Sequence, residues 1–199
     1  MSFSPVSSPS EVAQFLRLME TATLLPSPST APAQAQLTTM QVIETVAIRE
    51  SVKRNGHRYY LIDVYFKASS RSPTSVQGIP KKPSLQIQRR FSDFMSLRYE
   101  IYHYARQRHS HGNVPCHYCA KIIAHNILGR GQPGLFTKIV NSEDSTRRLL
   151  DQFTKKIVDL TLRTSTAREP ECAGQKYIPL VVSRFLHPDE PSNEEGTKN

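Results

Sequence analysis

The chain has 199 residues, 14 of them proline, and a hydrophobic fraction of 38%, which suits one domain of ordinary size with extended segments beside it. No apolar run approaches the roughly 20 residues of a membrane-spanning helix, and the first residues resemble no secretory signal, so we expect neither an integral membrane protein nor export. The net charge is +9, and residues 40–188 hold 24 Lys and Arg against 11 Asp and Glu. This balance favours a polyanionic partner such as an anionic membrane, although a scattered, solvated surface charge is the alternative.

The beginning of the chain, residues 1–38, is rich in Ser, Pro, Thr, Ala and Gln, a composition that does not bury a core, and we expect it to be disordered. Within it, Ser8-Pro9-Ser10-Glu11 fits a capping box with proline at the first helical position and predicts a short helix over 9–20. Such a helix would either contact a protein partner or dock transiently on its own chain, and the sequence leaves both open. Its apolar face comprises Val12, Phe15, Leu16 and Met19.

Three strands follow, and the first two are joined at Asn55-Gly56, a strong signal for a two-residue hairpin turn. In the third strand Leu85 and Ile87 alternate with polar residues, so Arg90 is expected on the polar face, where it can meet a ligand. The predicted strands are 41–49, 58–67 and 84–90.

The period of the hydrophobic residues then changes to that of a helix, with Ser92 as its predicted N-cap. Residues 109–141 read as irregular, and the tail 189–199 is acidic and expected to be disordered. Strands followed by helices predict an α+β domain over 40–188, in which a three-stranded antiparallel meander packs against a helical subdomain. The apolar stripe of the first helix is Phe94, Leu97, Ile101 and Tyr104, and the later helices are predicted over 143–163 and 176–187.

The junction between the third strand and the first helix is the most informative motif. Arg89 and Arg90 end the strand, Phe91 follows, and a helix begins at once. A helix N-terminus attracts phosphate, a guanidinium offers donors matched to phosphate oxygens, and an aromatic ring supplies a flat apolar wall. The motif therefore indicates an anion site. The alternative is an arginine paired with a carboxylate beside a phenylalanine in the core.

The meander, this junction and the later helices resemble a PX (phox homology) domain over residues 40–188. The sequence Arg-Arg-Phe-Ser-Asp-Phe closely matches the family signature, and Phe185-Leu186 resembles the family's last helix. The resemblance implies a cytoplasmic protein that is peripheral on endosomal membranes and binds phosphoinositides there, most often phosphatidylinositol 3-phosphate. It implies that Arg90 holds the 3-phosphate, that Phe91 stacks against the inositol ring and that Arg89 supports the pocket.

The segment between the two long helices departs from the family pattern, because it holds isolated prolines in place of a proline-rich string followed by lysine. Lys121 and Lys138 are the available lysines, and Lys138 is preferred for a headgroup phosphate. The family's helix arginine would fall at Thr146, and Arg147 is the next candidate. Candidates for insertion into lipid, with burial inside the protein as the alternative, are Ile127, Leu128, Leu135 and Phe136.

A second constellation consists of the pair Cys116 and Cys119, preceded by His109 and His111, which together could supply four zinc ligands. Cys172 is a further donor. Because there is a single Cys-x-x-Cys pair and a His-x-His arm is not its standard partner, we expect reduced, partly buried thiols and no bound metal, with zinc as the open alternative. A redox role for the pair is not expected, because no thioredoxin-like unit accompanies it.

The sequence carries no glycine-rich phosphate loop, no HExxH motif and no nucleophile elbow, so we expect neither an enzyme nor a cofactor. The first hypothesis is a lipid-binding module that uses Arg90 and Phe91. The alternative is a protein-interaction scaffold of the same fold, with weak or no lipid binding, whose terminal segments or basic face contact proteins. A nucleic-acid partner is not expected, because charge alone supports one.

Overall fold

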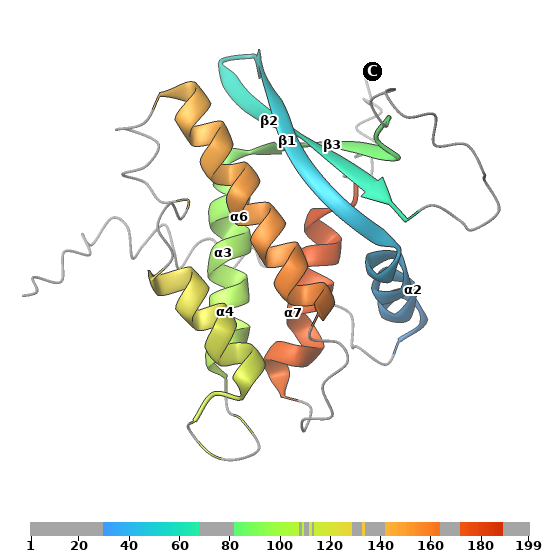
Figure 1. The fold of residues 1–199 in the computed structure, drawn as a ribbon, viewed down its shortest axis with the longest axis vertical. Coiled ribbons are helices and arrows are strands. Elements are labelled where there is room, and N and C mark those ends of the chain that lie inside the picture. Colours follow the sequence, from blue (N-terminus) through green and yellow to red (C-terminus); the bar gives the residue numbers. More distant parts are fainter. Residues whose placement is uncertain are drawn as a thin grey trace, which may run out of the picture.

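The computed structural model describes residues 30–67, 82–107, 109, 112, 114–128, 133, 142–163 and 172–188, and for residues 32 and 126–128 the backbone alone. The fold of these residues is α+β, as predicted, with one three-stranded sheet and five helices (Figure 1). In chain order the elements are α2 (Ala31–Gln41), β1 (Ile43–Arg54), β2 (His57–Phe66), β3 (Leu85–Arg90), α3 (Phe91–Arg106), α4 (His117–Leu128), α6 (Glu143–Arg163) and α7 (Ala173–Phe185).

The sheet is an antiparallel meander in the order β1-β2-β3, which confirms the predicted topology. Asn55 and Gly56 form the turn between β1 and β2 with positive φ angles of 49° and 77°, a backbone conformation that these two residue types adopt most readily. The register between β2 and β3 places Tyr59 opposite Arg90 and Tyr60 opposite Arg89. The end of β3 therefore lies beside the hairpin.

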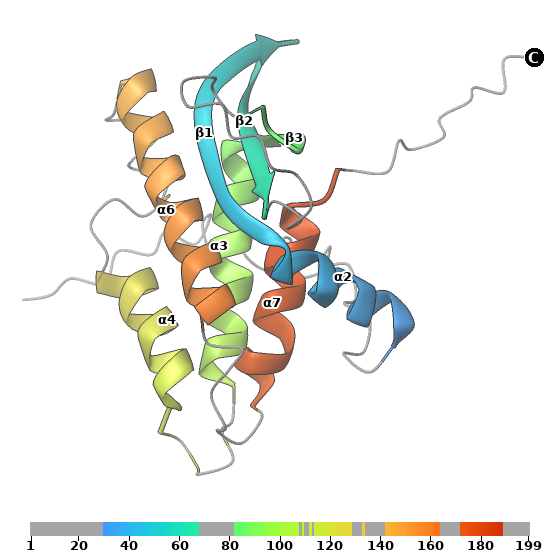
Figure 2. The same ribbon diagram turned by 45° about the vertical axis from the view of Figure 1, so that its right-hand side comes forward.

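The helices lie against one side of this sheet. In both views α3 and α7 run below the strands, α6 lies alongside β1, and α4 lies toward the end of the molecule opposite the sheet (Figure 1, Figure 2). Phe94 of α3 connects the layers, because its ring is 6.0 Å from the ring of Tyr60 in β2 and 5.1 Å from that of Phe185 in α7, centroid to centroid. The buried side chains of the three strands and of α3, α6 and α7 form one continuous core.

α6 is attached to β1 through an irregularity in the strand. The register of β1 against β2 shifts between Ile48 and Glu50, which marks a β-bulge on an edge strand. The backbone N–H of Ile48 donates to Asp151 Oδ1 at 2.8 Å, and Arg147 Nη1 donates to the carbonyl oxygen of Ile48 at 3.3 Å. Two side chains of α6 thus satisfy backbone groups that the sheet leaves open, and the helix covers the strand edge.

The helix α2 corrects the expectation that residues 1–38 are disordered, because residues 31–38 are helical. Ala33 is fully buried, and Ser183 Oγ of α7 donates to the carbonyl oxygen of Gln36 at 3.2 Å. Composition alone predicts that this segment buries no core, but Ala and Gln both favour helices when a neighbouring surface supports them, and α7 supplies that surface. The predicted helix 9–20, the linker 68–81 and the tail 189–199 lie outside the described residues.

Two further boundaries differ from the prediction. Residues 117–128 form α4, where the sequence was interpreted as irregular, and bury Tyr118, Cys119 and Ile122. α3 begins at Phe91 with Arg90 at its N-cap position, two residues earlier than a Ser92 cap would give. The cause is Asp93, whose Oδ2 accepts the backbone N–H of Arg90 at 2.6 Å and thereby closes the first turn. The long helix predicted over 143–163 is confirmed as α6.

The bulge contact makes a prediction about stability. Replacing Asp151 by Ala should lower the free energy of unfolding by about 1–3 kcal/mol, because the N–H of Ile48 would lose its acceptor in a partly buried position. Asp151→Asn keeps an acceptor oxygen and should cost less. Asp159→Ala, which removes surface ion pairs on the same helix, should change stability by less than about 1 kcal/mol. Urea unfolding followed by circular dichroism gives the three values, and equal losses for Asp151→Ala and Asp159→Ala would contradict the assignment.

Candidate functional site

The two arginines at the end of β3 point to opposite faces of the sheet, as alternation along a strand requires. Arg89 is buried, with 6% of its surface exposed, whereas Arg90 is exposed. The predicted placement of Arg90 on the polar face is therefore what the structure shows, and the two guanidinium groups have different roles.

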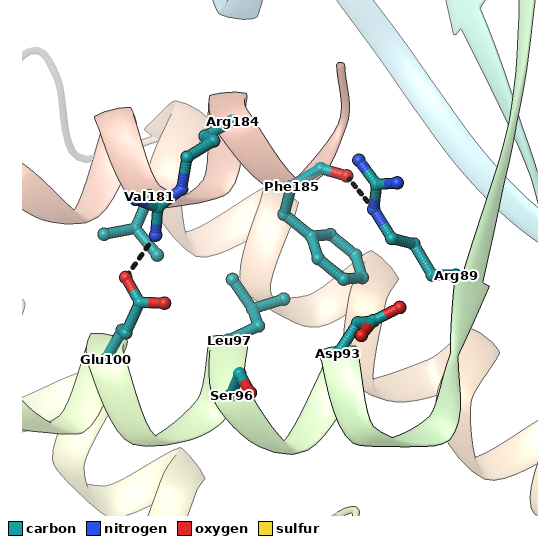
Figure 3. Close-up of a pocket in the computed structure, with 8 residues that line it drawn as sticks. All are labelled: Arg89, Asp93, Ser96, Leu97, Glu100, Val181, Arg184 and Phe185. Carbon is teal, nitrogen blue, oxygen red and sulfur yellow. Dashed lines mark hydrogen bonds and ion pairs between the residues drawn. The ribbon is translucent and has the colours of Figure 1, made fainter. Parts of the chain in front are cut away.

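Arg89 connects the sheet to the end of α7 (Figure 3). Its Nε donates to the carbonyl oxygen of Phe185 at 3.0 Å, and its Nη2 donates to that of His187 at 2.5 Å. The last carbonyl groups of a helix lack intrahelical partners, so a cation at this position satisfies them and also complements the helix dipole. The guanidinium carbon lies 5.7 Å from the ring centroid of Phe185.

Arg89 lines a shallow cavity of about 270 Å³ between α3 and α7, which also contains the ion pair between Glu100 and Arg184 (Figure 3). A second, separate cavity lies beside Arg90, and Arg89 is not among the residues that line it. Arg89 therefore has no direct contact with the cavity in which Arg90 lies, and its support of a headgroup pocket stays a prediction. Its hydrogen bonds are those of a structural residue that holds α7 against β3.

Arg90 faces outward and is held by an aromatic residue. Its Nε and Nη2 both donate to Tyr59 Oη, at 3.0 and 2.5 Å, and its guanidinium carbon is 5.0 Å from the centroid of that ring. Within the described part of the chain, no carboxylate forms a salt bridge with Arg90. Because a guanidinium carries more N–H donors than these bonds use, Arg90 retains donors for an anionic ligand.

A cavity of about 440 Å³ lies between the hairpin, the start of α3 and the start of α6. Its polar wall combines side chains from all three elements, and Phe91 and Tyr60 form its apolar floor. The residues that line it are Lys53, Gly56, His57, Arg58, Tyr60, Arg90, Phe91, Ser92, Glu143 and Thr146. The cavity thus joins the predicted Arg90-Phe91 pair to basic residues of the hairpin.

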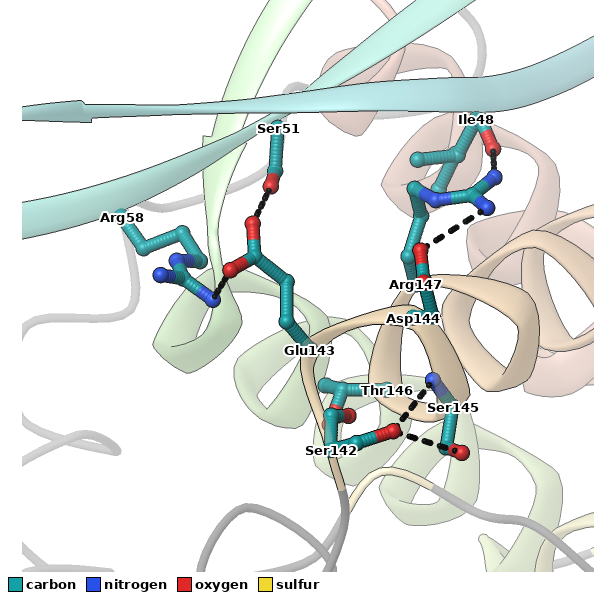
Figure 4. A network of polar contacts seen from close by, with 9 residues as sticks. All are labelled: Ile48, Ser51, Arg58, Ser142, Glu143, Asp144, Ser145, Thr146 and Arg147. Atoms are coloured by element: carbon teal, nitrogen blue, oxygen red, sulfur yellow. Dashed lines mark hydrogen bonds and ion pairs between the residues drawn. The ribbon is translucent and has the colours of Figure 1, made fainter.

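The described residues that line the cavity are net cationic, because Lys53, Arg58 and Arg90 outnumber the one carboxylate among them, Glu143. Arg58 Nη1 is 2.5 Å from Glu143 Oε2, and Ser51 Oγ donates to Glu143 Oε1 at 2.5 Å (Figure 4). One of the three cations is thereby neutralised by a partly exposed partner. Lys53 and Arg90 supply the remaining positive charge.

Phe91 is 4% exposed and belongs to the core, so only a small part of its surface borders the cavity. Beside it, Tyr60 is also buried, and burial raises the pKa of its hydroxyl above the ordinary value. The Tyr60 phenol is therefore neutral at physiological pH. These two rings make an uncharged floor below the basic wall.

Arg147 is not part of this cavity. Its Nη1 donates to the carbonyl oxygen of Ile48, and its Nη2 pairs with Asp144 Oδ1 at 3.3 Å, so the side chain lies along the edge of β1 (Figure 4). Thr146, the preceding residue, lines the cavity instead and is buried, with its Oγ1 donating to the carbonyl oxygen of Ser142 at 3.0 Å. The structure does not place Arg147 among the described residues that line this cavity, because its guanidinium bonds to the bulge in β1, and its contact with a headgroup stays a prediction.

None of the other candidates is among the described residues that line the cavity. Lys138, Leu135 and Phe136 lie outside the described residues, as do the side chains of Ile127 and Leu128 in α4. His111 also lies outside them. The remaining zinc candidates are grouped near the far end of α3. They are His109, Cys116 and Cys119, joined there by Cys172.

The basic residues of the hairpin were missed from the sequence, although a signal for them exists. Lys53 pairs with Arg58 across the turn, and Arg58 lies on the same face of β2 as the buried Ile62 and Val64. Extending the alternation of β2 back to its first residues would have placed Arg58 on the helix-facing side, beyond the end of the core. A cation at such a position lines a cavity and not the outer surface of the sheet.

The geometry suits non-covalent binding of a small polyanion. A cavity of about 440 Å³ falls within the range of roughly 300–1,000 Å³ that ligand pockets span, and its basic wall faces an aromatic floor. The only carboxylate among the lining residues is already paired with an arginine. No helix in the described ranges is both long and apolar enough to cross a bilayer.

Comparisons with protein-family models, curated proteins and solved structures gave no match for this chain.

The different roles of the two arginines lead to a stability test. Arg89→Ala should lower the free energy of unfolding by roughly 2–4 kcal/mol, because the carbonyl groups of Phe185 and His187 would lose charged donors in a buried position. Arg90→Ala, at an exposed position, should change it by less than about 0.5 kcal/mol. Urea denaturation of both variants decides the matter, and equal midpoints would contradict the structural role of Arg89.

Proposed function

We propose that this chain is a phosphoinositide-binding module of the PX type, and that the cavity beside Arg90 and Phe91 receives the headgroup. The proposal rests most on one observation, namely that Arg90 opens onto a basic cavity without a carboxylate partner among the described residues. The preferred ligand is phosphatidylinositol 3-phosphate, and the site of action is an endosomal-type membrane. The function is binding and not catalysis.

The chemistry of recognition follows from the lining residues. The fork of N–H groups on Arg90 matches the oxygens of a phosphate monoester, and Lys53, which also lines the cavity, adds an ammonium group. Ser92 stands in the first turn of α3, where free backbone N–H groups and the helix dipole attract negative charge. The floor of Phe91 offers an apolar surface to the inositol ring.

The hairpin adds attraction to a membrane surface that does not depend on the headgroup. Lys53 and Arg54 are exposed at the end of β1, next to the turn. Each basic residue near an anionic leaflet contributes about 1 kcal/mol, and this term weakens as salt rises. Specific binding through Arg90 and non-specific attraction through the hairpin therefore respond to different variants.

A second candidate function is a protein-interaction scaffold of the same fold. The observation that favours it is the pairing of Arg58 with Glu143, together with the engagement of Arg147 at the edge of β1. Both arrangements reduce the number of arginines available to a headgroup. Under this alternative the basic face contacts acidic proteins, and binding to lipid is weak and indifferent to the headgroup.

Arg90 provides the main test of lipid recognition. In liposome sedimentation, Arg90→Ala should weaken binding to vesicles containing phosphatidylinositol 3-phosphate at least tenfold, because hydrogen bonds to charged groups contribute about 1.5–3 kcal/mol. Arg54→Ala removes the same charge from the end of β1, outside the cavity, and should cost less, because Arg54 contributes only non-specific attraction. Wild-type protein that binds vesicles of phosphatidylserine equally well, with no effect of Arg90→Ala, would favour the scaffold.

Glu143 provides a test in the opposite direction. Glu143→Gln should strengthen binding to the same vesicles by roughly fivefold, because it removes a negative charge from the cavity and releases Arg58, and such a contact contributes about 1 kcal/mol in water. Asp144→Asn is the matched control, since Asp144 is the neighbouring acid and pairs with Arg147 away from the cavity. An equal gain in both variants would show a general charge effect and would count against the cavity as the binding site.

A further inference from the structure

A second cluster of reactive side chains lies at the opposite end of α3 from Arg90. One ligand atom from each of four residues lies within 4.8 Å of all the others, and the residues are His109, Cys116, Cys119 and Cys172. They come from three places in the chain, namely the segment after α3, the beginning of α4 and the beginning of α7. Since α3 has 16 residues, it separates this cluster from the basic cavity by about 24 Å.

The spacing of the sulfur atoms fits a shared metal ion, and no disulfide joins the three cysteines. Cys172 Sγ is 3.7 Å from Cys116 Sγ and 3.5 Å from Cys119 Sγ, and all three cysteines are free. A disulfide would require about 2.05 Å between sulfurs. Two thiolates bound tetrahedrally to zinc, each at about 2.3 Å, are about 3.8 Å apart. The observed separations therefore correspond to sulfurs that face a common centre.

His109 supplies an independent observation. It is 92% buried, its Nε2 is 3.2 Å from the carbonyl oxygen of Ala105, and its Nδ1 has no hydrogen-bond partner among the described residues. A carbonyl oxygen can only accept, so Nε2 carries the proton and donates, which leaves the lone pair of Nδ1 as the ring atom able to bind a metal ion. Histidines that bind metals characteristically donate their other N–H to such an acceptor, which orients the ring.

Two of the thiols lie at the N-termini of helices. The carbonyl oxygen of Cys116 accepts the N–H of Ala120 at 2.8 Å, and that of Cys172 accepts the N–H of Lys176 at 3.1 Å, so these cysteines stand at the N-caps of α4 and α7. The positive end of a helix dipole stabilises a thiolate. At these two sulfurs the helix dipoles therefore act in favour of a metal-bound thiolate and against burial, which raises the pKa of the Cys116 thiol.

α7 packs closely against the cluster at Gly174. A Cβ atom built on Gly174, in the first turn of α7, would lie 2.3 Å from Cys119 Sγ. Glycine at this position therefore permits α7 to approach α4 closely enough for Cys172 to meet Cys119. A side chain here would separate the two helix ends.

We propose that His109 Nδ1 and the thiolates of Cys116, Cys119 and Cys172 bind one structural Zn²⁺ ion. Binding releases the three thiol protons, and four protein ligands complete a tetrahedral site without an open position, which is the arrangement of structural zinc and not of catalytic zinc. The ion would join the end of α3 to the beginnings of α4 and α7. Compared with the sequence-based candidates, Cys172 takes the place of His111 as the fourth ligand.

The test begins with full-length protein purified under reducing conditions from zinc-supplemented cells. Inductively coupled plasma mass spectrometry should find about one zinc per chain, retained on gel filtration. After removal of zinc, Co²⁺ should restore a tetrahedral spectrum with thiolate-to-metal charge-transfer bands. His109→Ala and Cys172→Ser should each lower the affinity for Co²⁺ at least tenfold, as the loss of one ligand requires. His117→Ala is the matched control, because His117 is exposed within the same Cys-x-x-Cys loop and is not part of the cluster.

Several outcomes would overturn the proposal. One is that wild-type protein contains well under one equivalent of zinc and that its Co²⁺ form gives only an octahedral spectrum. Another is that variants at the four positions keep full metal occupancy and an unchanged Co²⁺ spectrum. If the cysteine variants do not fold, chelation of the wild type decides, since removal of zinc should lower its melting temperature and added Zn²⁺ should restore it. A melting temperature that does not respond to chelation would show that the thiols are packed in reduced form without metal.

Discussion

Strand alternation at the end of β3 is the constraint on which much of the structure depends. Two consecutive arginines cannot point to the same side of a sheet, so Arg89 enters the protein and Arg90 leaves it. The inward guanidinium binds the terminal carbonyl groups of α7 and draws that helix against the sheet. The outward one lies on Tyr59 at the mouth of a basic cavity. One dipeptide therefore both closes the fold and opens the proposed site.

The cavity exists because the sheet extends beyond the helices that cover it. The inner face of β2 carries core residues along most of its length, and near the hairpin the same face carries Arg58 over open space. α6 limits this space from the other side, since Glu143 at its first turn pairs with Arg58. The bulge in β1 sets the position of α6 and also removes Arg147 from the cavity. Under the proposed function, the affinity for an anionic headgroup thus depends on the hairpin cations Lys53 and Arg58 and on the opposing carboxylate of Glu143 in α6.

The two proposed sites lie at opposite ends of α3 and use different physics. The basic cavity is open to solvent, so its attraction for anions depends on salt and on exposed charges. The cysteine cluster is buried, so a metal ion there would act on the stability of the helical layer through α4 and α7. Arg89 donates to the carbonyl oxygen of Phe185 at the end of α7, and Cys172 at its beginning contacts Cys119. Side chains from other elements therefore contact both ends of this helix.

The sequence alone determined the meander, the Asn55-Gly56 turn, the bounds of α6 and the outward position of Arg90, because alternation, turn chemistry and helical periodicity are properties of neighbouring residues. It did not reveal α2 and α4, whose helical states depend on surfaces supplied by α7 and α3. Only the tertiary structure decided that Arg89 caps a distant helix, that Glu143 neutralises a hairpin cation and that Cys172 joins the cysteine pair. Each of these contacts unites residues far apart in the chain, and local pattern carries no information about which distant surfaces meet when the core closes.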